Sequence, residues 1–598
     1  MQVQSTGQDY PGWTDVYFYA STNTSITLSD TYLGQQRTWL TAGASAILTL
    51  TGTFPESVPP GSYYVGWIID PDNRIEEADE DNNTAYKSTP RLRVISQPRA
   101  QLRIYVDANA RGTNSGLDWR NAFTSLQDAI AIAASGDEIR IAAGTYTPDK
   151  GLGITAGDRQ ASFDLSSGIT VRGGYAGADA PDPDARDIEL YATVLSGDLR
   201  ANDLAVADPC DLWKQTSRAD NSRHVIRLID ANQMTVLDGV QVHAGYAGTA
   251  LDTDLLASDS QGAGLYVRSG NLSLRGCRFS GNWAQSDGGA VFAIDGTLQI
   301  LDCTFIANGA GTDVGQAQGT GGAIRTDGRG QMTVSGCRFD RNFAGAQGGA
   351  LDNSGGDVVT IRCLFLRNYA SRLGGGAIWN NDGGLSAVNC TFIANRCDYS
   401  GGAIANGRGG SLYAVNCCLH ANTSLFEAGA IDNFFGGTAA LSNCTLAANG
   451  PGAWAIVCGP AFGQTTSTLT IANCILWDGG NEIRNVGQST VTVTCTDVQG
   501  GSKDPANLNA DPLFVLPAGA DGIIGTEDDD LRLKPSSPCI DRGDSALLPE
   551  DFVDADGDGN LTEPLPVDLD NNTRITGAAV DMGAYEGQSA ASTLYVSD

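Results

Sequence analysis

The chain has 598 residues, of which 75 are Gly and 41% are hydrophobic, so it can form a core while turning often. It carries 69 Asp plus Glu against 37 Lys plus Arg, a formal net charge of -32, which disfavours nucleic acid and anionic membranes as partners because both need basic surfaces. The sequence has no apolar run of about 18 residues, which excludes a membrane-spanning helix in this chain.

The first 98 residues contain strand-like runs in DVYFYASTNTSITLSDTYLG and PPGSYYVGWIIDPDNRIEEADEDNNT. Over 14–96 they resemble part of the CARDB module of bacterial surface proteins, and this resemblance implies a partial Ig-like β-sandwich over 1–98. Its loop DPDNRIEEADEDNN concentrates carboxylates, so Asp70 and Asp72 are candidate calcium ligands.

Residues 99–150 are expected to cap the next domain. The run from IYVDANARG to IRIAAGTY reads as a strand, an amphipathic helix over about 122–134 and a second strand. A helix here would cover the open end of a repeat array, as terminal repeats must.

Residues 151–504 predict a right-handed parallel β-helix. Within them, short alternating runs typical of strands precede a Cys that recurs every 26 to 34 residues, and an Asn follows five positions later. Gly-Gly-Ala corners then lead to another strand. The Cys column is Cys277, Cys303, Cys337, Cys363, Cys390, Cys417, Cys444 and Cys474, with Cys495 expected to continue it. The Asn column is Asn282, Asn308, Asn342, Asn368, Asn395, Asn422 and Asn449.

Identical residues in successive coils should stack into ladders about 4.8 Å apart. Cys and Phe are expected to point inward, and the Asn amides to bond the coils above and below. A second Asn column follows the Gly-Gly-Ala corners at Asn353, Asn380, Asn406 and Asn433. Beside it, Arg325 and Asp352 are expected to form a surface ion pair of small value.

The FxxN motifs (FSGN, FIAN, FDRN, FLRN) and the GGAI, GGAL and GGAV corners resemble the repeats of chlamydial polymorphic outer membrane proteins over about 225–500. That resemblance implies a surface-exposed, adhesive β-helix. Residues 505–588, with SSPCIDRGD and VDLDNNTRITGAAVDMGAYEG, resemble the choice-of-anchor Q segment that closes β-helices in secreted bacterial proteins. STLYVSD within 589–598 is similar to LRIYVD and is expected to begin another repeat unit, as in a segment of a longer modular protein.

The closing segment also predicts a calcium site. DADGDGN places Asp554, Asp556 and Asp558 at alternate positions before Gly559, with Asn560 next, as in the first half of a calcium loop. The twelfth position is Leu565 rather than Glu, and a solvated acidic loop explains the pattern equally well. No organic cofactor is expected.

The fourteen cysteines favour packing over a disulfide framework or a zinc site. CxxC pairs are absent and only three His occur, which disfavours zinc. Stacked strands separate Cβ atoms by more than the roughly 3.8 Å of a disulfide, so a reduced buried ladder is expected.

Glycan cleavage is the less favoured function. Hydrolysis needs carboxylates about 5 to 9.5 Å apart, whereas Asp352 and Asp432 should lie three coils, or about 14 Å, apart. The aromatic residues Trp379, Phe434 and Phe435 follow Gly-Gly-Ala corners, where they could stack on sugars or fill space.

The expected function is therefore that of a non-catalytic adhesive or structural protein, outside or on the surface of a bacterial cell. Its expected partners are other surface proteins, copies of itself, or envelope or extracellular polysaccharide. The alternative is a polysaccharide lyase or glycoside hydrolase, similar to pectate lyases or polygalacturonases, that acts on acidic glycans.

Overall fold

The computed structural model describes residues 2–4, 12–41, 44–48, 61–75, 83–94, 101–248, 258–312, 318–450, 453–459 and 465–587. The chain divides into two compact units, Met1–Ala100 and Gln101–Asp598. The predicted repeat start at 589–598 lies outside the described residues. Among the residues that the structure describes, no helix is both long and apolar enough to cross a bilayer.

The N-terminal unit is built from antiparallel strands. Its main sheet has the order β3-β2-β5-β6, and β1 pairs with β4 in a second, small sheet. Val16, Phe18, Leu40 and Leu48 form its core. The strands are β1 (Gln2–Gln4), β2 (Gly12–Ser21), β3 (Thr31–Leu40), β4 (Ser45–Ile47), β5 (Gly61–Ile69) and β6 (Thr84–Val94).

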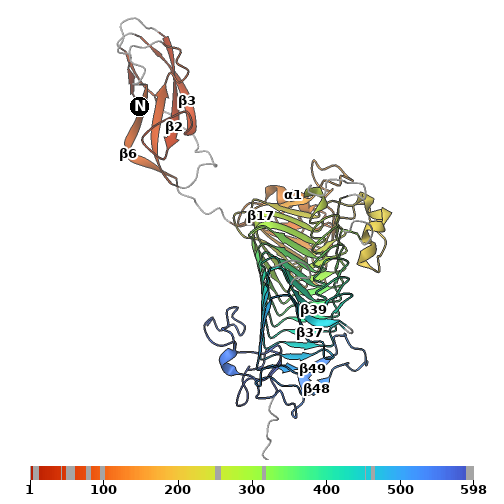
Figure 1. The fold of residues 1–598 in the computed structure, drawn as a ribbon. Coiled ribbons are helices and arrows are strands. Elements are labelled where there is room, and N and C mark those ends of the chain that lie inside the picture. Colours follow the sequence, from red (N-terminus) through yellow and green to blue (C-terminus); the bar gives the residue numbers. More distant parts are fainter. Residues whose placement is uncertain are drawn as a thin grey trace, which may run out of the picture. The chain divides into compact units, whose positions relative to one another are not determined.

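The second unit opens with the capping helix α1 (Leu126–Ile132) between β7 (Arg103–Val106) and β8 (Glu138–Ala142). Figure 1 shows α1 beside the first coils at one end of the solenoid. The helix is shorter than predicted at both ends. Phe123 bridges Val106 as β structure, Ser125 caps the first turn through its hydroxyl, and Ala133 is already extended.

The solenoid is a right-handed parallel β-helix, which confirms the predicted fold class. Its coils stack into parallel sheets of 22, 12 and 7 strands, and the first sheet takes two strands from most coils. A representative coil contains β31 (Ile378–Asn381), β32 (Gly384–Val388), β33 (Thr391–Ile393) and β34 (Arg396–Cys397). The last coil contains β45 (Ile483–Asn485), β46 (Thr490–Thr494) and β47 (Asp497–Val498).

Aromatic and amide ladders run through the core. The rings of Phe339 and Phe365 stack with centroids 4.8 Å apart and planes 4° apart. Asn368 donates from Nδ2 to Asn395 Oδ1 at 2.9 Å and to the Phe339 carbonyl at 2.9 Å. The second Asn column repeats this arrangement, since Asn353 Nδ2 donates to Asn380 Oδ1 at 2.7 Å. The amides thereby satisfy buried backbone groups at each turn of the solenoid.

The eight cysteines of the predicted column are buried and free in the structure. Each thiol stacks on the next coil: the Cys277 amide donates to Cys303 Sγ at 3.4 Å, and Cys277 Sγ donates to the Leu237 carbonyl at 3.3 Å. The contacts are those of packed thiols, and the redox state of the column stays a prediction.

Cys495 does not continue the column. It has a left-handed φ of 47°, like Asn473 (53°), which precedes Cys474 in the coil before. The ladder position is taken by Thr496, whose Oγ1 accepts the Cys474 amide at 3.3 Å. The last coil is one residue out of step with the Cys spacing, so the prediction for Cys495 was wrong.

The Arg325–Asp352 pair is not at the surface. Arg325 lies 3.4 Å from Asp352, whose side chain has 0% exposure, and 3.2 Å from Asp287. Burial raises the pKa of Asp352 and the Arg325 charge lowers it. Loss of Arg325 would leave a buried carboxylate without its cation, which costs more than a surface pair.

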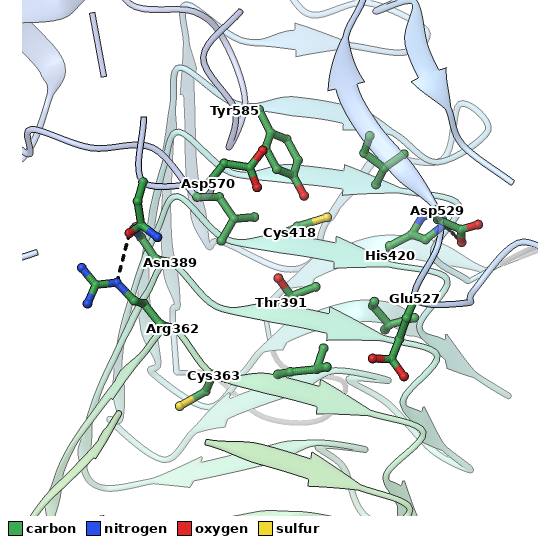
Figure 2. A pocket seen from close by; sticks show the side chains of 15 residues that line it. Arg362, Cys363, Asn389, Thr391, Cys418, His420, Glu527, Asp529, Asp570 and Tyr585 are labelled. Carbon is green, nitrogen blue, oxygen red and sulfur yellow. Dashed lines mark hydrogen bonds and ion pairs between the residues drawn. The ribbon is translucent and has the colours of Figure 1, made fainter. Parts of the chain in front are cut away.

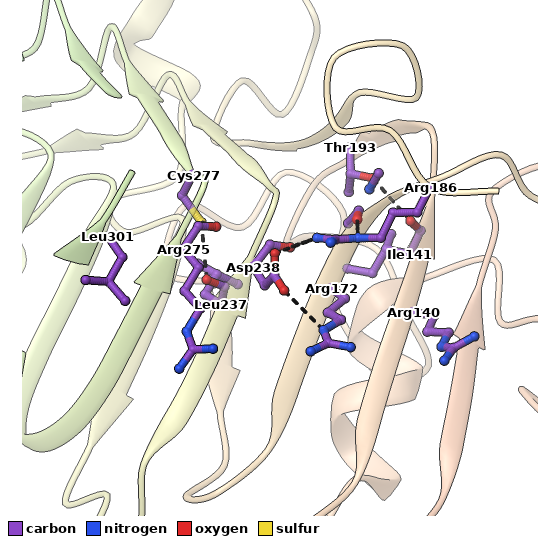
Figure 3. A network of polar contacts seen from close by, with 12 residues as sticks. Arg140, Ile141, Arg172, Arg186, Thr193, Leu237, Asp238, Arg275, Cys277 and Leu301 are labelled. Carbon is purple, nitrogen blue, oxygen red and sulfur yellow. Dashed lines mark hydrogen bonds and ion pairs between the residues drawn. The ribbon is translucent and has the colours of Figure 1, made fainter. Parts of the chain in front are cut away.

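In the first coils an ion-pair network covers the outer face of the sheet. Asp238 lies between Arg172 at 3.1 Å and Arg186 at 2.5 Å, as Figure 3 shows. Glu138 accepts from Arg140 at 3.3 Å and from Arg172 at 3.2 Å. In the column of Arg172 and Asp238, the middle coils carry the apolar residues Ile361, Val388 and Val415 instead.

The segment from 505 runs back along the flank of the coils. Its strands β48 (Phe514–Leu516) and β49 (Asp530–Leu533) lie near the C-terminal end of the solenoid in Figure 1. In the later coils an Asn precedes the ladder Cys and anchors the segment: Asn416 Nδ2 donates to the Val567 carbonyl at 2.7 Å and Asn389 Nδ2 to the Asp568 carbonyl at 2.9 Å. The segment therefore covers several successive coils.

Candidate functional site

The groove between the coils and the closing segment, shown in Figure 2, has a volume of about 350 Å³. Three of the titratable groups that line it are engaged by partners. His420 Nε2 lies 2.8 Å from Asp529, and both side chains are 2% exposed. Glu527 lies 2.7 Å from Arg338. This groove is therefore mainly the interface that holds the closing segment.

The thiol and phenol in the same groove are held neutral. Burial raises the pKa of Cys418 to about 12, and it raises the pKa of Tyr585 well above its usual value. Neither side chain is an activated nucleophile, since a reactive thiol needs a lowered pKa. The groove offers little reactive chemistry.

A second cavity of about 300 Å³ lies on the outer face of the large sheet. We call it the aromatic pocket. It is lined by Gln347, Leu373, Trp379, Asn381, Tyr399, Arg408, Glu427, Asp432, Phe434 and Phe435. Its walls come from β31, β35 (Ile404–Gly407), β39 (Ala428–Asn433) and the loops that follow or precede them.

The register of three strands builds the pocket. Trp379 in β31 pairs with Ala405 in β35, which pairs with Asp432 in β39. These three residues form one column, so the indole and the carboxylate stand two strand spacings, about 9.6 Å, apart at their Cα atoms. The methyl side chain of Ala405 leaves the space between them free of a large side chain.

Two glycines let the aromatic side chains close the pocket. A Cβ on Gly407 would stand 2.5 Å from the Phe434 ring, and a Cβ on Gly374 would stand 2.7 Å from the Trp379 ring. The rings of Trp379 and Phe434 lie 5.4 Å apart, and those of Phe434 and Phe435 lie 5.2 Å apart. The result is an aromatic wall that continues from the buried indole to the exposed Phe435 ring.

Three buried polar atoms in this pocket have no hydrogen-bond partner: Trp379 Nε1, Asn381 Oδ1 and Asp432 Oδ1. Trp379 is 7% exposed and Asp432 is 6% exposed. An unpaired buried polar atom costs about 1 to 3 kcal/mol. One donor and two acceptors in the pocket residues therefore lack a hydrogen-bond partner within the protein.

The carboxylates of the pocket differ in their surroundings. Burial raises the pKa of Asp432 to about 7, with a further contribution from the charge of Glu427 and an opposing one from a Ser400 hydrogen bond. Glu427 lies 3.8 Å from Arg484. Asp432 is thus the titratable group of the pocket near neutral pH.

Exposed apolar side chains surround the pocket mouth. Leu373, Tyr399 and Phe435 line the pocket and are 54%, 39% and 37% exposed. Phe426 is 70% exposed and its ring lies 5.8 Å from that of Tyr399. Exposed apolar surface grouped around a pocket marks a binding site more often than scattered single residues do.

The sequence had identified only part of this site. For Trp379, Phe434 and Phe435 the sequence left stacking on a partner open and favoured filling space under a neighbouring loop. In the structure Trp379 is buried, Phe434 is half-buried and Phe435 is exposed. Glu427 and Tyr399 were missed because they come from loops of other coils. The sequence SLFEAGA could have indicated Glu427, because two apolar residues and an acid precede the Ala-Gly-Ala that replaces Gly-Gly-Ala in this coil.

The predicted calcium ligands fall into two places. Asp554, Asp556 and Asp558 each offer a carboxylate oxygen within 4.8 Å of the others. Asn560 follows this group: its amide donates to Asp558 Oδ1 at 2.7 Å, and its Oδ1 accepts the Thr562 amide at 3.3 Å.

In the N-terminal unit, the two candidate ligands are engaged by neighbours within the loop. Asp70 accepts the Ile75 amide at 2.6 Å. Asp72 lies 2.7 Å from Arg74. Residues 76–82 of that loop lie outside the described residues.

Residues 220–392 match the family described as the right handed beta helix region, and residues 1–87 match CARDB. The chain thus combines a right-handed parallel β-helix with a CARDB-type module. A search of the curated proteins gives no significant match.

A comparison with solved structures finds three that are similar to this chain at low identity. The chain is 16% identical to pectate lyase Pel9A over 82% of this chain and 97% of that one, with a TM-score of 0.41. It is 12% identical to a rhamnogalacturonan lyase over 73% and 97%, with a TM-score of 0.38. It is 14% identical to the catalytic unit of a GH87 alpha-1,3-glucanase from Streptomyces thermodiastaticus strain HF3-3 over 82% and 89%, with a TM-score of 0.27.

Proposed function

We propose that this chain is a non-catalytic, saccharide-binding segment of a bacterial surface protein, and that it adheres through the aromatic pocket. The observation that carries the proposal is the set of unpartnered atoms on Trp379, Asn381 and Asp432 beside aromatic rings. A sugar ring has apolar faces for stacking and hydroxyls that both donate and accept hydrogen bonds. The pocket offers the complement of both.

The charge of the site favours a neutral sugar. Asp432 and Glu427 face the pocket, Arg408 at its edge is exposed, and the chain has a net charge of -32. A polyanionic glycan would meet like charge on approach. Sugar hydroxyls could donate to Asp432 Oδ1 and Asn381 Oδ1 and accept from Trp379 Nε1.

The test is calorimetric titration of the full chain with neutral and uronate-containing oligosaccharides. Phe435→Ala removes an exposed ring and should weaken binding at least tenfold without changing the melting temperature. Thr438→Ala, on the exposed face of β40 (Thr438–Ser442), is the matched control. Equal binding by wild type and Phe435→Ala, or none by either, would reject the proposal.

Glycan cleavage is a second candidate, because of one observation. Asp432 has a pKa of about 7, as a general acid requires, and Glu427 supplies a second carboxylate in the same pocket. Reducing-end and unsaturated-product assays on neutral and acidic glycans would detect it. Turnover by wild type that Asp432→Asn abolishes would establish the enzyme and replace the non-catalytic function.

A further inference from the structure

The closing segment contains an acidic cluster that is larger than the Asp-x-Asp-x-Asp pattern. Asp551, Asp556 and Glu563 each place a carboxylate oxygen within 4.8 Å of the other two, and Asp556 also belongs to the group with Asp554 and Asp558. Asp551 and Glu563 lie on the two arms of one loop, whose arms are joined by a hydrogen bond from the Asp551 amide to the Glu563 carbonyl at 2.8 Å.

An independent feature distinguishes this cluster from solvated surface acids. Asp551 has 0% exposure, and its Oδ1 has no hydrogen-bond partner. Its other oxygen accepts the Ala555 amide at 2.7 Å, which fixes the orientation of the carboxylate. Glu563 Oε1 is also buried without a partner. Two unpartnered oxygens thus belong to side chains of the same group.

Arg362 approaches this loop only at the Ala555 carbonyl. Among the described residues, no Lys or Arg forms an ion pair with any of the five carboxylates of the cluster, namely Asp551, Asp554, Asp556, Asp558 and Glu563. A bound cation would supply the missing charge and the missing partners.

We propose that Asp551, Asp556 and Glu563 bind a calcium ion, with Asp554 and Asp558 completing the acidic rim. The donors are all carboxylate oxygens, which suit hard cations, and a ligand set drawn from an irregular loop suits the variable coordination of Ca²⁺ better than the strict octahedron of Mg²⁺. The buried Asp551 and the half-buried Glu563 extend the predicted ligand set. This site is independent of the saccharide pocket.

The ion would fasten the closing segment to the solenoid. Between the ligands, Ala555 packs in one buried cluster with Leu565, Val388 and Val415. Arg362 donates to the Ala555 carbonyl from the coil below. Calcium held by Asp551 and Glu563 would tie the two arms of the loop and so keep this apolar contact closed.

The experiment is equilibrium dialysis and calorimetry of the full chain with CaCl₂, followed by thermal melting in calcium and in chelator. We expect saturable calcium binding, weaker magnesium binding, and a melting temperature several degrees higher in calcium. Glu563→Gln should weaken calcium binding at least tenfold, and Asp551→Asn should do the same if it folds.

Asp521→Asn is the matched control, because it removes one exposed carboxylate of the same segment from outside the cluster. Wild-type protein that binds no calcium, or binding that Glu563→Gln leaves unchanged, would overturn the proposal. Equal loss with Asp521→Asn would assign the effect to net charge and also overturn it.

Discussion

Trp379 and Asp432 occupy the same column of the solenoid, two strands apart, with Ala405 between them. The indole and the carboxyl group therefore face one cavity although 53 positions separate them in the sequence. A parallel β-helix forms such a site when the residues at equivalent positions of successive coils differ. The small side chain of Ala405 is needed for the pocket, because it leaves space between Trp379 and Asp432.

Gly407→Ala should weaken saccharide binding by shifting the aromatic wall. The new Cβ would stand 2.5 Å from the Phe434 ring, so the ring must move away from Trp379. We expect at least a fivefold loss of affinity in calorimetric titration, with a modest loss of stability. Unchanged affinity would show that Phe434 does not shape the site.

Asp432→Asn should change the pH dependence of stability. Burial raises the pKa of Asp432 to about 7 from 3.8, so the folded state retains a proton that the unfolded chain releases between these values. The contribution of Asp432 to the free energy of unfolding is therefore fully present below about pH 4. It decreases by up to about 4 kcal/mol as the pH rises to about 7. Asn stays neutral.

The variant should therefore gain stability relative to wild type as pH rises, measured by urea unfolding at pH 4.5 and pH 8. A wild-type-minus-variant difference that is the same at both pH values would contradict the burial of a proton-binding Asp432.

The sequence predicted the ladders well because one packing problem recurs in every coil. The positions of Phe339 and Asn368 in the ladders could be predicted from the repeat period alone. The pocket depends instead on departures from the repeat, such as Ala405 in place of a polar residue and Glu427 in a loop of another coil. Cys495 shows the same limit, since a change of one residue in a turn moved it from the core to a left-handed position.

Asn368→Ala should destabilise the solenoid by about 2 to 4 kcal/mol. Its Oδ1 accepts the Asn342 amide at 3.0 Å and Asn342 Nδ2 at 2.9 Å, and all of these groups are buried. Truncation leaves the buried Asn342 amide without its partner and removes the bonds from Asn342 Nδ2 and to the Phe339 carbonyl. Ser411→Ala, at an exposed position of β36 (Ser411–Val415), is the control and should unfold like wild type in urea.

The cysteine column should be mostly reduced. The Cys444 amide donates to Cys474 Sγ at 3.2 Å, and Cys444 Sγ donates to the Ala414 carbonyl at 3.4 Å, so the thiols already fill hydrogen-bonding roles in the core. Alkylation under denaturing, non-reducing conditions followed by mass spectrometry should label most of the eight. Recovery of disulfide-linked peptides from consecutive coils would refute this.

The closing segment should detach locally when its amide anchors are removed. Asn416 has φ of 48°, donates to the Val567 carbonyl at 2.7 Å and donates to Asn389 Oδ1 at 3.1 Å. Asn416→Gly keeps the left-handed backbone accessible while deleting both bonds, whereas Asn416→Ala adds about 1 kcal/mol of backbone strain. Because the coils remain held by their own ladders, we expect Asn416→Gly to increase proteolysis within 505–587 severalfold, with little change in cleavage of 258–450.

Asn443→Gly should have a smaller effect, since its bond to the Asp581 carbonyl is longer at 3.4 Å. If Asn416→Gly increases cleavage equally in both regions, the segment is an integral part of the solenoid and the anchoring role of Asn416 is refuted.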